Sequence, residues 1–533
     1  MKKYLLSFFT LILPIITFAQ DVAEKGLDQR IDEGFKPISD TISNIIFFEI
    51  YGTPFVLILL VGSALFFTLY FSFPNIRYFG KAINTVRGKY DEVEGGHHAE
   101  ETSMTIDGDI RDTIRDESKE GEVSHFQALA TAVSGTVGNG NIAGVALAIA
   151  LGGPGATFWM IICGFLGMST KFVECTLGVQ YRDVGEDGTV YGGPMYYITK
   201  GLKEKGFATL GKVAAVLFAI FCIGGSFGGG NAAQSNQATI VLKELMGLES
   251  TGAGFWIGVV LAFLVGIIII GGIKRIASVT EKIVPFMAVL YLIACLYIIL
   301  SNFSLIDNAI SLILTEAFNP KAIGVGGVIG VLLVGFKRAA FSNEAGAGSA
   351  SIAHSAVKTK YSASEGLVAL LEPFIDTVVI CTMTALVIII FNFGGAFEYG
   401  GDGLGAVMID GVSYEGAGIT SKAFAKYIPY SNLFLTVAVV LFAVSTMISW
   451  SYYGLQSWKF LFGRGKAADM TYKLLFLMFV VIGAAASMKS IWDFSDAMIF
   501  AMVFPNMIGL YFLFPVVKKQ LNRYLDAIKA AKS

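Results

Sequence analysis

Long apolar segments, separated by shorter polar ones, dominate this chain. Eleven of them approach or exceed the ~20 residues that cross a bilayer as a helix. They are centred near Leu60, Val137, Phe165, Gly225, Leu264, Leu290, Leu333, Thr382, Phe442, Val480 and Met507. A shorter apolar stretch between Ser304 and Phe318 is interrupted by charged residues, which favours a helix along the membrane interface. The pattern predicts an all-α polytopic membrane protein with about 11 transmembrane helices.

Composition supports a membrane protein and argues against several other classes. Of 533 residues, 54% are hydrophobic and only 15% are charged, whereas soluble domains carry about 25% charged residues. A net charge of −2 offers no basic face for a nucleic acid. The five cysteines lie scattered in apolar segments without disulfide or metal-ligand spacing. The four histidines lack the H-E-x-x-H spacing, and no nucleophile–base set is visible, so we do not expect an enzyme.

The N-terminal part of the chain has the pattern of an exported segment. Residues 1–20 begin with two lysines, continue as an apolar run and end in Thr17-Phe18-Ala19, as a secretory signal does. The alternative is an uncleaved first anchor. Residues 21–75 then form an exported polar segment and the first membrane span, and residues 76–123 form a cytoplasmic loop. Its part Asp91–Glu122 is strongly acidic and poor in large apolar residues, so we expect disorder there.

Basic residues predict the orientation in the membrane. Lys and Arg concentrate before the second, fourth, sixth, eighth and tenth spans and in the C-terminal tail, residues 517–533. Basic loops stay on the cytoplasmic side. We therefore expect a multi-pass protein of the plasma (inner) membrane with its N-terminus outside and its C-terminus in the cytoplasm.

Two spans are interrupted by residues that form helices poorly. The second span contains Ser134–Gly144, with four glycines and two asparagines in eleven residues. Close packing of small residues between helices accounts for the glycines but not for Asn139 and Asn141. The seventh span contains Gly335–Ser349, where Lys337, Arg338 and Glu344 are costly at membrane depth. The alternative for this segment is that the span ends near Gly335. Two unwound helices at membrane depth predict a cavity or site between them.

The positions of the two breaks predict an inverted repeat. They lie five helices apart, and because five is odd, two successive five-helix units have opposite orientations in the membrane. We expect the first unit at residues 124–302, an interfacial helix at 303–320 and the second unit at 321–516. Discontinuous helices at matching positions of an inverted repeat are typical of secondary transporters with a site at the membrane midplane.

Several motifs resemble the alanine or glycine:cation symporter family. They are Gly138–Ala146, Gly152–Ala156, Phe158–Met160, Gly192–Tyr197 and Phe341–Gly346. The resemblance covers roughly residues 126–514. It implies a LeuT-like fold and import of small neutral amino acids (alanine, glycine) coupled to sodium symport by alternating access. Proton-coupled symport is the alternative. An ion channel would share the polar mid-span residues, but nothing here resembles a pore loop or a charged ring.

The substrate is expected at the first break and the fourth span. Backbone N–H groups freed at the break open the second half of the helix, whose N-terminal dipole end attracts a carboxylate. In the fourth span, three consecutive glycines allow close approach of a ligand, and two amide side chains share a face at i, i+3. The alternative for the amides is hydrogen bonding between helices. The predicted substrate-binding residues are Gly138, Asn139, Gly140, Asn141, Phe227, Asn231 and Gln234, with Phe227 as an apolar wall.

A sodium site is expected beside the substrate. Carbonyl groups freed around Ser134 and Val137 suit Na⁺, and the LeuT-like resemblance implies that Ser445 and Thr446 of the ninth span pass beside them. The alternative is that these two hydroxyls bond back to their own helix. Because no carboxylate lies among the four residues, we expect sodium-driven uptake to be electrogenic.

Trp450 is a candidate for the residue that sets the size of the substrate. It follows Thr446 by four residues, so both lie on one face of the ninth helix. A rigid ring at this depth would cap the pocket and exclude side chains larger than a methyl group. The alternative is a tryptophan anchored at the headgroup level.

Overall fold

The computed structural model describes residues 27–94, 121–185, 188–248, 252–319, 327–401, 403 and 405–531. The signal-like segment 1–20 and most of the acidic loop, residues 95–120, lie outside the described residues. The expectations of a cleaved signal and of disorder in that loop therefore stay predictions.

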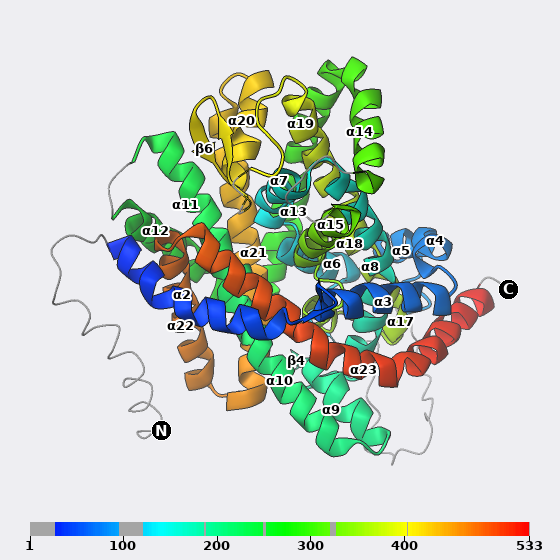
Figure 1. Cartoon of the computed structure of the whole chain (residues 1–533). Helices are drawn as coiled ribbons and strands as arrows, with labels where there is room; N and C mark the ends of the chain where they lie inside the picture. The colour runs from blue at the N-terminus through cyan, green and yellow to red at the C-terminus, as the bar shows by residue number, and fades with distance from the viewer. Residues whose placement is uncertain are drawn as a thin grey trace, which may run out of the picture.

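Each of the eleven predicted spans coincides with a single helix or with two or three consecutive helices (Figure 1). In chain order they are α3 (Phe55–Tyr70), α6 (His125–Thr136) with α7 (Ala143–Gly152), α8 (Gly155–Gln180), α10 (Ala208–Phe227) with α11 (Ala233–Met246), α12 (Ala253–Ile269), α13 (Gly272–Ser301), α15 (Gly327–Asn343), α17 (Ser362–Ala369) with α18 (Leu371–Pro373) and α19 (Thr382–Asn392), α21 (Ser431–Phe462), α22 (Lys466–Ala485) and α23 (Met488–Ala530). Seven described helices are long and apolar enough to cross a membrane, and α6 with α7 forms a bent pair that also passes. The prediction of a helical, multi-pass membrane protein is confirmed.

The elements of the two predicted repeat units follow one another in the same order. In the first unit, the hairpin β3 (Asp183–Val184) and β4 (Val190–Tyr191) and the short helix α9 (Pro194–Glu204) precede α10. In the second unit, the hairpin β5 (Val407–Ile409) and β6 (Val412–Tyr414) and the short helix α20 (Ala417–Tyr427) precede α21. Figure 1 shows α9 at the bottom of the molecule and α20 at the top, as expected for units of opposite orientation.

The remaining elements flank these units. The helix α2 (Leu27–Ile46) runs along α23, where the Ser39 hydroxyl donates to Ser490 O at 2.9 Å. The hairpin β1 (Glu49–Ile50) and β2 (Thr53–Pro54) leads into α3, and α4 (Pro74–Arg77) and α5 (Phe79–Val86) follow it. The predicted interfacial stretch is the helix α14 (Ile306–Phe318), which is held to α8 by a hydrogen bond from Trp159 Nε1 to Ala317 O at 3.1 Å. Its position relative to a membrane surface stays a prediction.

Both predicted breaks are present. The axes of α6 and α7 meet at 56°, and between them a short 3₁₀ turn, Asn139–Asn141, is stabilised by Asn141 Oδ1, which accepts from Gly138 N–H at 2.9 Å. The other helix, α15, continues to Asn343, so the alternative in which that span ends near Gly335 is wrong. The chain then unwinds before α16 (Ala350–His354).

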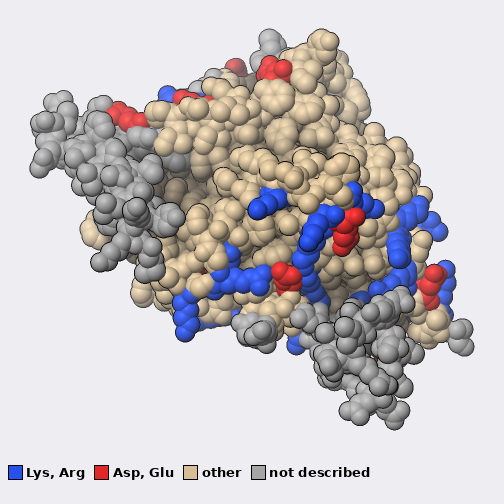
Figure 2. Space-filling model, turned by 90° about the horizontal axis from the view of Figure 1, so that it is seen from below, with Lys and Arg blue, Asp and Glu red and all other residues tan. Residues whose placement is uncertain are grey.

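The outer surface is divided into an apolar belt and a basic face. Large apolar side chains on α12 and α13 are strongly exposed, for example Phe263 at 69% and Phe286 at 61%, as lipid-facing residues are. Seen from below, Lys and Arg side chains gather across one face, with few Asp and Glu among them (Figure 2). We call this surface the basic face. It lies on the side of the molecule that carries α9.

Candidate functional site

A pocket lies where the two helix breaks meet α21. The empty space among its lining residues, counting the part that is open to solvent, is about 230 Å³. Its walls come from the first break, from the end of α15, from the fourth span, from α21 and from α23. Four of the predicted site residues line it, namely Gly140, Gln234, Thr446 and Trp450. The sequence-derived expectation of a cavity between the breaks therefore agrees with the structure.

Gln234 connects the first break to the fourth span. Its Oε1 accepts from the backbone N–H of Asn139 at 3.0 Å, and its carbonyl accepts from Asn139 Nδ2 at 3.2 Å. Its own Nε2 donates to Gly229 O at 2.9 Å. These bonds fix the unwound backbone against α11, so the broken segment has a defined shape although it is not helical.

The four residues predicted to bind sodium meet in one place, where each contributes a polar atom, although Ser445 does so only through its carbonyl oxygen. Thr446 Oγ1 donates to Ser134 O at 3.0 Å and lies 3.5 Å from Val137 O. The Ser134 hydroxyl donates to Ser445 O at 2.8 Å, so it ties α6 to α21 as well. The Ser445 hydroxyl instead donates to Phe442 O of its own helix, at 3.0 Å. Bonding back to the helix, left open by the sequence, is thus observed for Ser445 and not for Thr446.

Gly138 is the residue that allows this close approach. A Cβ at this position would collide with Thr446 Oγ1 and would lie 3.0 Å from Gln234 Oε1. Any larger residue would have to push α21 away from the break. The glycine is therefore needed for the contact between α21 and the carbonyl groups of α6.

Two of the predicted substrate contacts face away from the pocket. Asn231 Nδ2 donates to Phe476 O of α22 at 2.6 Å, and Phe227 stacks on Phe479 with ring centroids 4.6 Å apart. The helix between α10 and α11 is wound as a π-helix over Gly228–Ala232. Because a π-turn accommodates an extra residue per turn, it rotates Asn231 off the face that Gln234 presents, whereas the prediction assumed α-helical spacing. For Asn231, the alternative of bonding between helices is the one observed.

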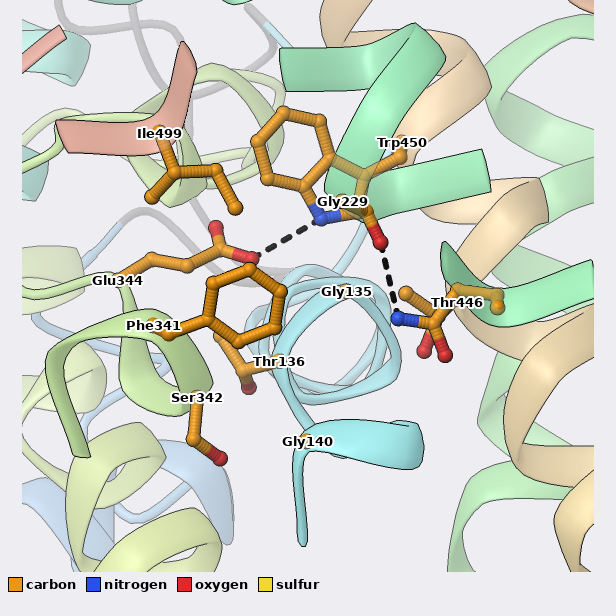
Figure 3. Close-up of a pocket in the computed structure, with 11 residues that line it drawn as sticks. Gly135, Thr136, Gly140, Gly229, Phe341, Ser342, Glu344, Thr446, Trp450 and Ile499 are labelled. Atoms are coloured by element: carbon orange, nitrogen blue, oxygen red, sulfur yellow. Dashed lines mark hydrogen bonds between the residues drawn. The ribbon is translucent and has the colours of Figure 1, made fainter. Parts of the chain in front are cut away.

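Trp450 lies at the pocket and is buried. Only 1% of it is exposed, so the alternative of an anchor at the headgroup level is wrong. Its ring packs so closely on the fourth span that a Cβ at Gly230 would collide with it. Its Nε1 donates to Glu344 Oε1 at 2.9 Å (Figure 3). Ser349 donates to the other oxygen of Glu344.

Glu344 is a pocket residue that the sequence marked as costly but did not assign to a role. It sits just after the end of α15 with a positive φ of 55°, a conformation that aims its side chain into the pocket. Figure 3 shows its carboxylate between Phe341 and Ile499, two apolar residues that also line the pocket. Glu344 is the one ionisable side chain among the described residues that line the pocket.

Asp376 is a second carboxylate that sequence reasoning missed. It is fully buried next to the pocket, and it accepts from Asn141 Nδ2 at 2.7 Å and from the Ser342 hydroxyl at 2.9 Å. The signal was an acidic residue inside an apolar segment, which at membrane depth marks a functional or paired group. Through Asp376 the two broken helices are joined to the eighth span.

Several known proteins are similar to this chain. The model of the family described as sodium:alanine symporters matches residues 37–533. The sodium/alanine symporter AgcS of Methanococcus maripaludis is 38% identical over 477 residues, which cover 89% of this chain and 95% of that protein. The probable sodium/glutamine symporter GlnT of Bacillus subtilis is 34% identical over 411 residues, which cover 77% of this chain and 80% of that protein. Among solved structures, MhsT in complex with L-phenylalanine aligns with a TM-score of 0.48 at 13% identity, covering 76% of this chain and 100% of that one.

Proposed function

Because the chain belongs to the sodium:alanine symporter family, and is a cation-coupled amino-acid transporter of the membrane, we propose that it imports alanine or glycine together with Na⁺ by alternating access. The observation that carries this proposal is the small pocket between two broken helices, with one carboxylate, freed backbone groups and a buried aromatic ring in its wall. Each of these features matches one part of a small zwitterion.

The cation is proposed to bind where α6 ends. The carbonyl oxygens of Ser134 and Val137 and the hydroxyl of Thr446 converge within 3.5 Å, and all three are neutral. Neutral oxygens at the end of a half-helix, where the dipole is negative, suit a monovalent cation. Binding there would link α6 to α21, so the ion would stabilise the geometry of the pocket beside it. Ser445 contributes to this link through its carbonyl.

The amino acid is proposed to lie across the pocket. Its carboxylate would face the backbone N–H of Gly140 at the break before α7, where the helix dipole favours negative charge. Its ammonium group would face Glu344, the carboxylate of the pocket wall. Trp450 and Phe341, which line the pocket, would enclose the side chain and would limit it to a hydrogen or a methyl group.

The orientation is proposed from the basic face. Lys and Arg gather on the side that carries α9. Placing that side in the cytoplasm of the plasma (inner) membrane, surrounded by the lipid bilayer, leaves the N-terminus outside and the C-terminus inside. The opposite side, with α20, is then the side from which substrate enters.

Proton-coupled symport is a second candidate because of the buried carboxylates. Glu344 lines the pocket, and Asp376 touches both broken helices through Asn141 and Ser342. A carboxylate that gains and loses a proton during the cycle would carry a proton in place of, or beside, Na⁺.

Uptake into liposomes separates these candidates. The purified protein is reconstituted, and labelled alanine or glycine is offered under an imposed Na⁺ gradient at equal pH, or under a pH gradient with Na⁺ replaced by choline. We expect uptake under the Na⁺ gradient, and we expect an inside-negative membrane potential to accelerate it because the cargo is positive. Protein-free liposomes are the control. Uptake driven by the pH gradient alone, and indifferent to choline replacement, would contradict the sodium assignment.

A further inference from the structure

A row of buried ionisable side chains lies outside the pocket, between the start of α6 and α8. Its members are Glu94, His125, Glu365, His354, Glu372 and Lys171. Each is at most 9% exposed, and four of them are fully buried. Acids and bases alternate along the row, and neighbouring members are in contact or nearly so. None of these residues lines the pocket.

His125 is the member whose geometry fixes a proton count. Its Nε2 lies 2.7 Å from Glu94 Oε2, and its Nδ1 is hydrogen-bonded to Glu365 Oε2. A neutral imidazole carries one N–H and one acceptor nitrogen, whereas both nitrogens donate in the imidazolium form. Both nitrogens here face carboxylate oxygens, and a hydrogen bond at each of them needs a proton there. The bridge therefore holds two protons, one more than a neutral histidine would bring to two carboxylates. His354 continues the row, with Nδ1 at 2.5 Å from Glu365 Oε1 and Nε2 at 3.6 Å from Glu372 Oε2.

The charges of the row balance only when both histidines are protonated. Three carboxylates then face Lys171 and two imidazolium groups, and Lys171 Nζ lies 3.0 Å from Glu372 Oε1. Buried charges are stable when they are paired, and a surplus of negative charge among these buried side chains would raise the free energy of the folded protein. Lys171 also lies close to the buried carboxylates of Glu174 and Glu344. The other titratable groups near the row are Tyr524, Glu281, Cys175 and Arg182.

The His125 bridge spans elements that have to separate if the pocket opens toward the basic face. His125 begins α6, the first half of one broken helix, while Glu365 belongs to α17. Glu94 adds a third attachment, because it also accepts from Tyr524 of α23 at 2.8 Å and from Thr359 at 2.8 Å. The adjoining backbone is joined too, since Lys358 N–H donates to Val123 O at 2.8 Å. The structure is therefore closed at this end of α6.

We propose that His125 is a proton-binding gate residue on the basic-face side of the transporter. The closed gate holds the extra proton in the bridge between Glu94 and Glu365. When α6 moves away from α17, the imidazolium loses its two carboxylate partners, releases one N–H proton to water and becomes neutral. The proposal rests on alternating access as stated under the proposed function. His125 does not touch substrate in this scheme, so it is a positioning residue for α6.

The proposal has a defined sign with respect to pH. Because closure takes up a proton, acid conditions favour the closed gate, and the gate opens more readily as the pH rises. For one proton, the ratio of closed to open gate changes by up to about tenfold per pH unit. We therefore expect alanine uptake to slow on the acid side as α6 is held against α17.

The test is the pH profile of Na⁺-driven alanine uptake into proteoliposomes. The pH is equal on both sides and is varied between about 6 and about 8.5, around the range in which histidine ordinarily titrates. Wild type should slow several-fold toward pH 6, and His125→Gln should flatten this acid limb. Glu94→Gln removes one carboxylate from the bridge but keeps the imidazole, so it should move the acid limb to lower pH by about one unit or more. Lys200→Gln is the matched control, because it breaks the Lys200–Asp183 ion pair outside the row.

The outcomes separate this proposal from the proposed function. Active His125→Gln and Glu94→Gln proteins with the wild-type pH profile would overturn the gate. If His125→Gln does not insert or fold, the profile of Glu94→Gln decides by itself, in the same two directions. A wild-type protein without Na⁺-driven uptake would overturn the proposed function instead. A shift of the acid limb in Lys200→Gln equal to that in Glu94→Gln would show that the limb reports surface charge, and it would also overturn the gate.

Discussion

Removal of the Thr446 hydroxyl tests the proposed sodium site most directly. Thr446→Val keeps the branched shape of a side chain that is only 1% exposed, so packing is largely preserved while the oxygen is lost. In the structure that oxygen lies 3.0 Å from Ser134 O and 3.5 Å from Val137 O. The substitution therefore removes one of the neutral oxygens that would surround Na⁺ and leaves the two carbonyl groups in place.

The size of the effect follows from the loss of one polar contact with a charge. Hydrogen bonds to charged groups contribute about 1.5–3 kcal/mol, and we use this range for the contact between the hydroxyl and the ion. Since 1.4 kcal/mol is a factor of ten, the Na⁺ concentration for half-maximal uptake should rise ~10- to 100-fold. The order of preference among competing amino acids should not change, because the hydroxyl is proposed to contact the ion and not the substrate side chain.

The assay is the initial rate of labelled alanine uptake over a series of Na⁺ concentrations, with choline keeping the ionic strength constant. Ser449→Ala is the matched control. Ser449 is also fully buried on α21, one turn further along, and its hydroxyl has no hydrogen-bond partner in the structure. The reasoning would be refuted if Thr446→Val kept the wild-type Na⁺ concentration for half-maximal uptake. It would also be refuted if Ser449→Ala raised that concentration by the same factor.

Three further substitutions test the rest of the pocket. Trp450→Ala should admit serine, valine or leucine as competitors with a tens-fold gain, since apolar pockets discriminate by about 1–3 kcal/mol per methylene; a folded variant that still rejects every larger amino acid would place the ring outside the substrate site. Glu344→Gln should raise the half-saturating alanine concentration ~10- to 100-fold, because the charged contact with the ammonium is lost; unchanged alanine saturation would contradict this role. Gly138→Ala should weaken Na⁺ saturation as Thr446→Val does, because its Cβ would displace the Thr446 hydroxyl. The control is Gly62→Ala, where a Cβ meets nothing within 4 Å, and equal Na⁺ saturation in these two glycine variants would rule out the close approach.

Much of the fold could be read from hydrophobicity and local helix preference. A span is a local property, because every residue of an apolar segment contributes to the same transfer free energy. Each predicted centre therefore lies on a helix, except Val137, which lies in the first break. The breaks are local as well. Glycines and asparagines around Val137, and the polar run that contains Glu344, disrupt a helix without any help from the rest of the chain. The residues of the first break and the one-turn spacing of Thr446 and Trp450 were likewise visible in the sequence.

Only the tertiary structure decided which side chains of those helices meet. A π-turn at Gly228–Ala232 rotates Asn231 toward α22, and no α-helical spacing rule contains that rotation. Glu344 stood out in the sequence only as a costly charge, and Asp376 was missed, because their partners, Trp450 and Asn141, are far away along the chain. The bridge joins His125 to Glu94, which is 31 positions away along the chain, and to Glu365, which is 240 positions away. The sequence by itself thus determined the membrane helices, their interruptions and the family resemblance, since these depend on neighbouring residues. The pocket and the row of buried ionisable side chains depend on how each helix is rotated against its neighbours, and that rotation is set by long-range packing.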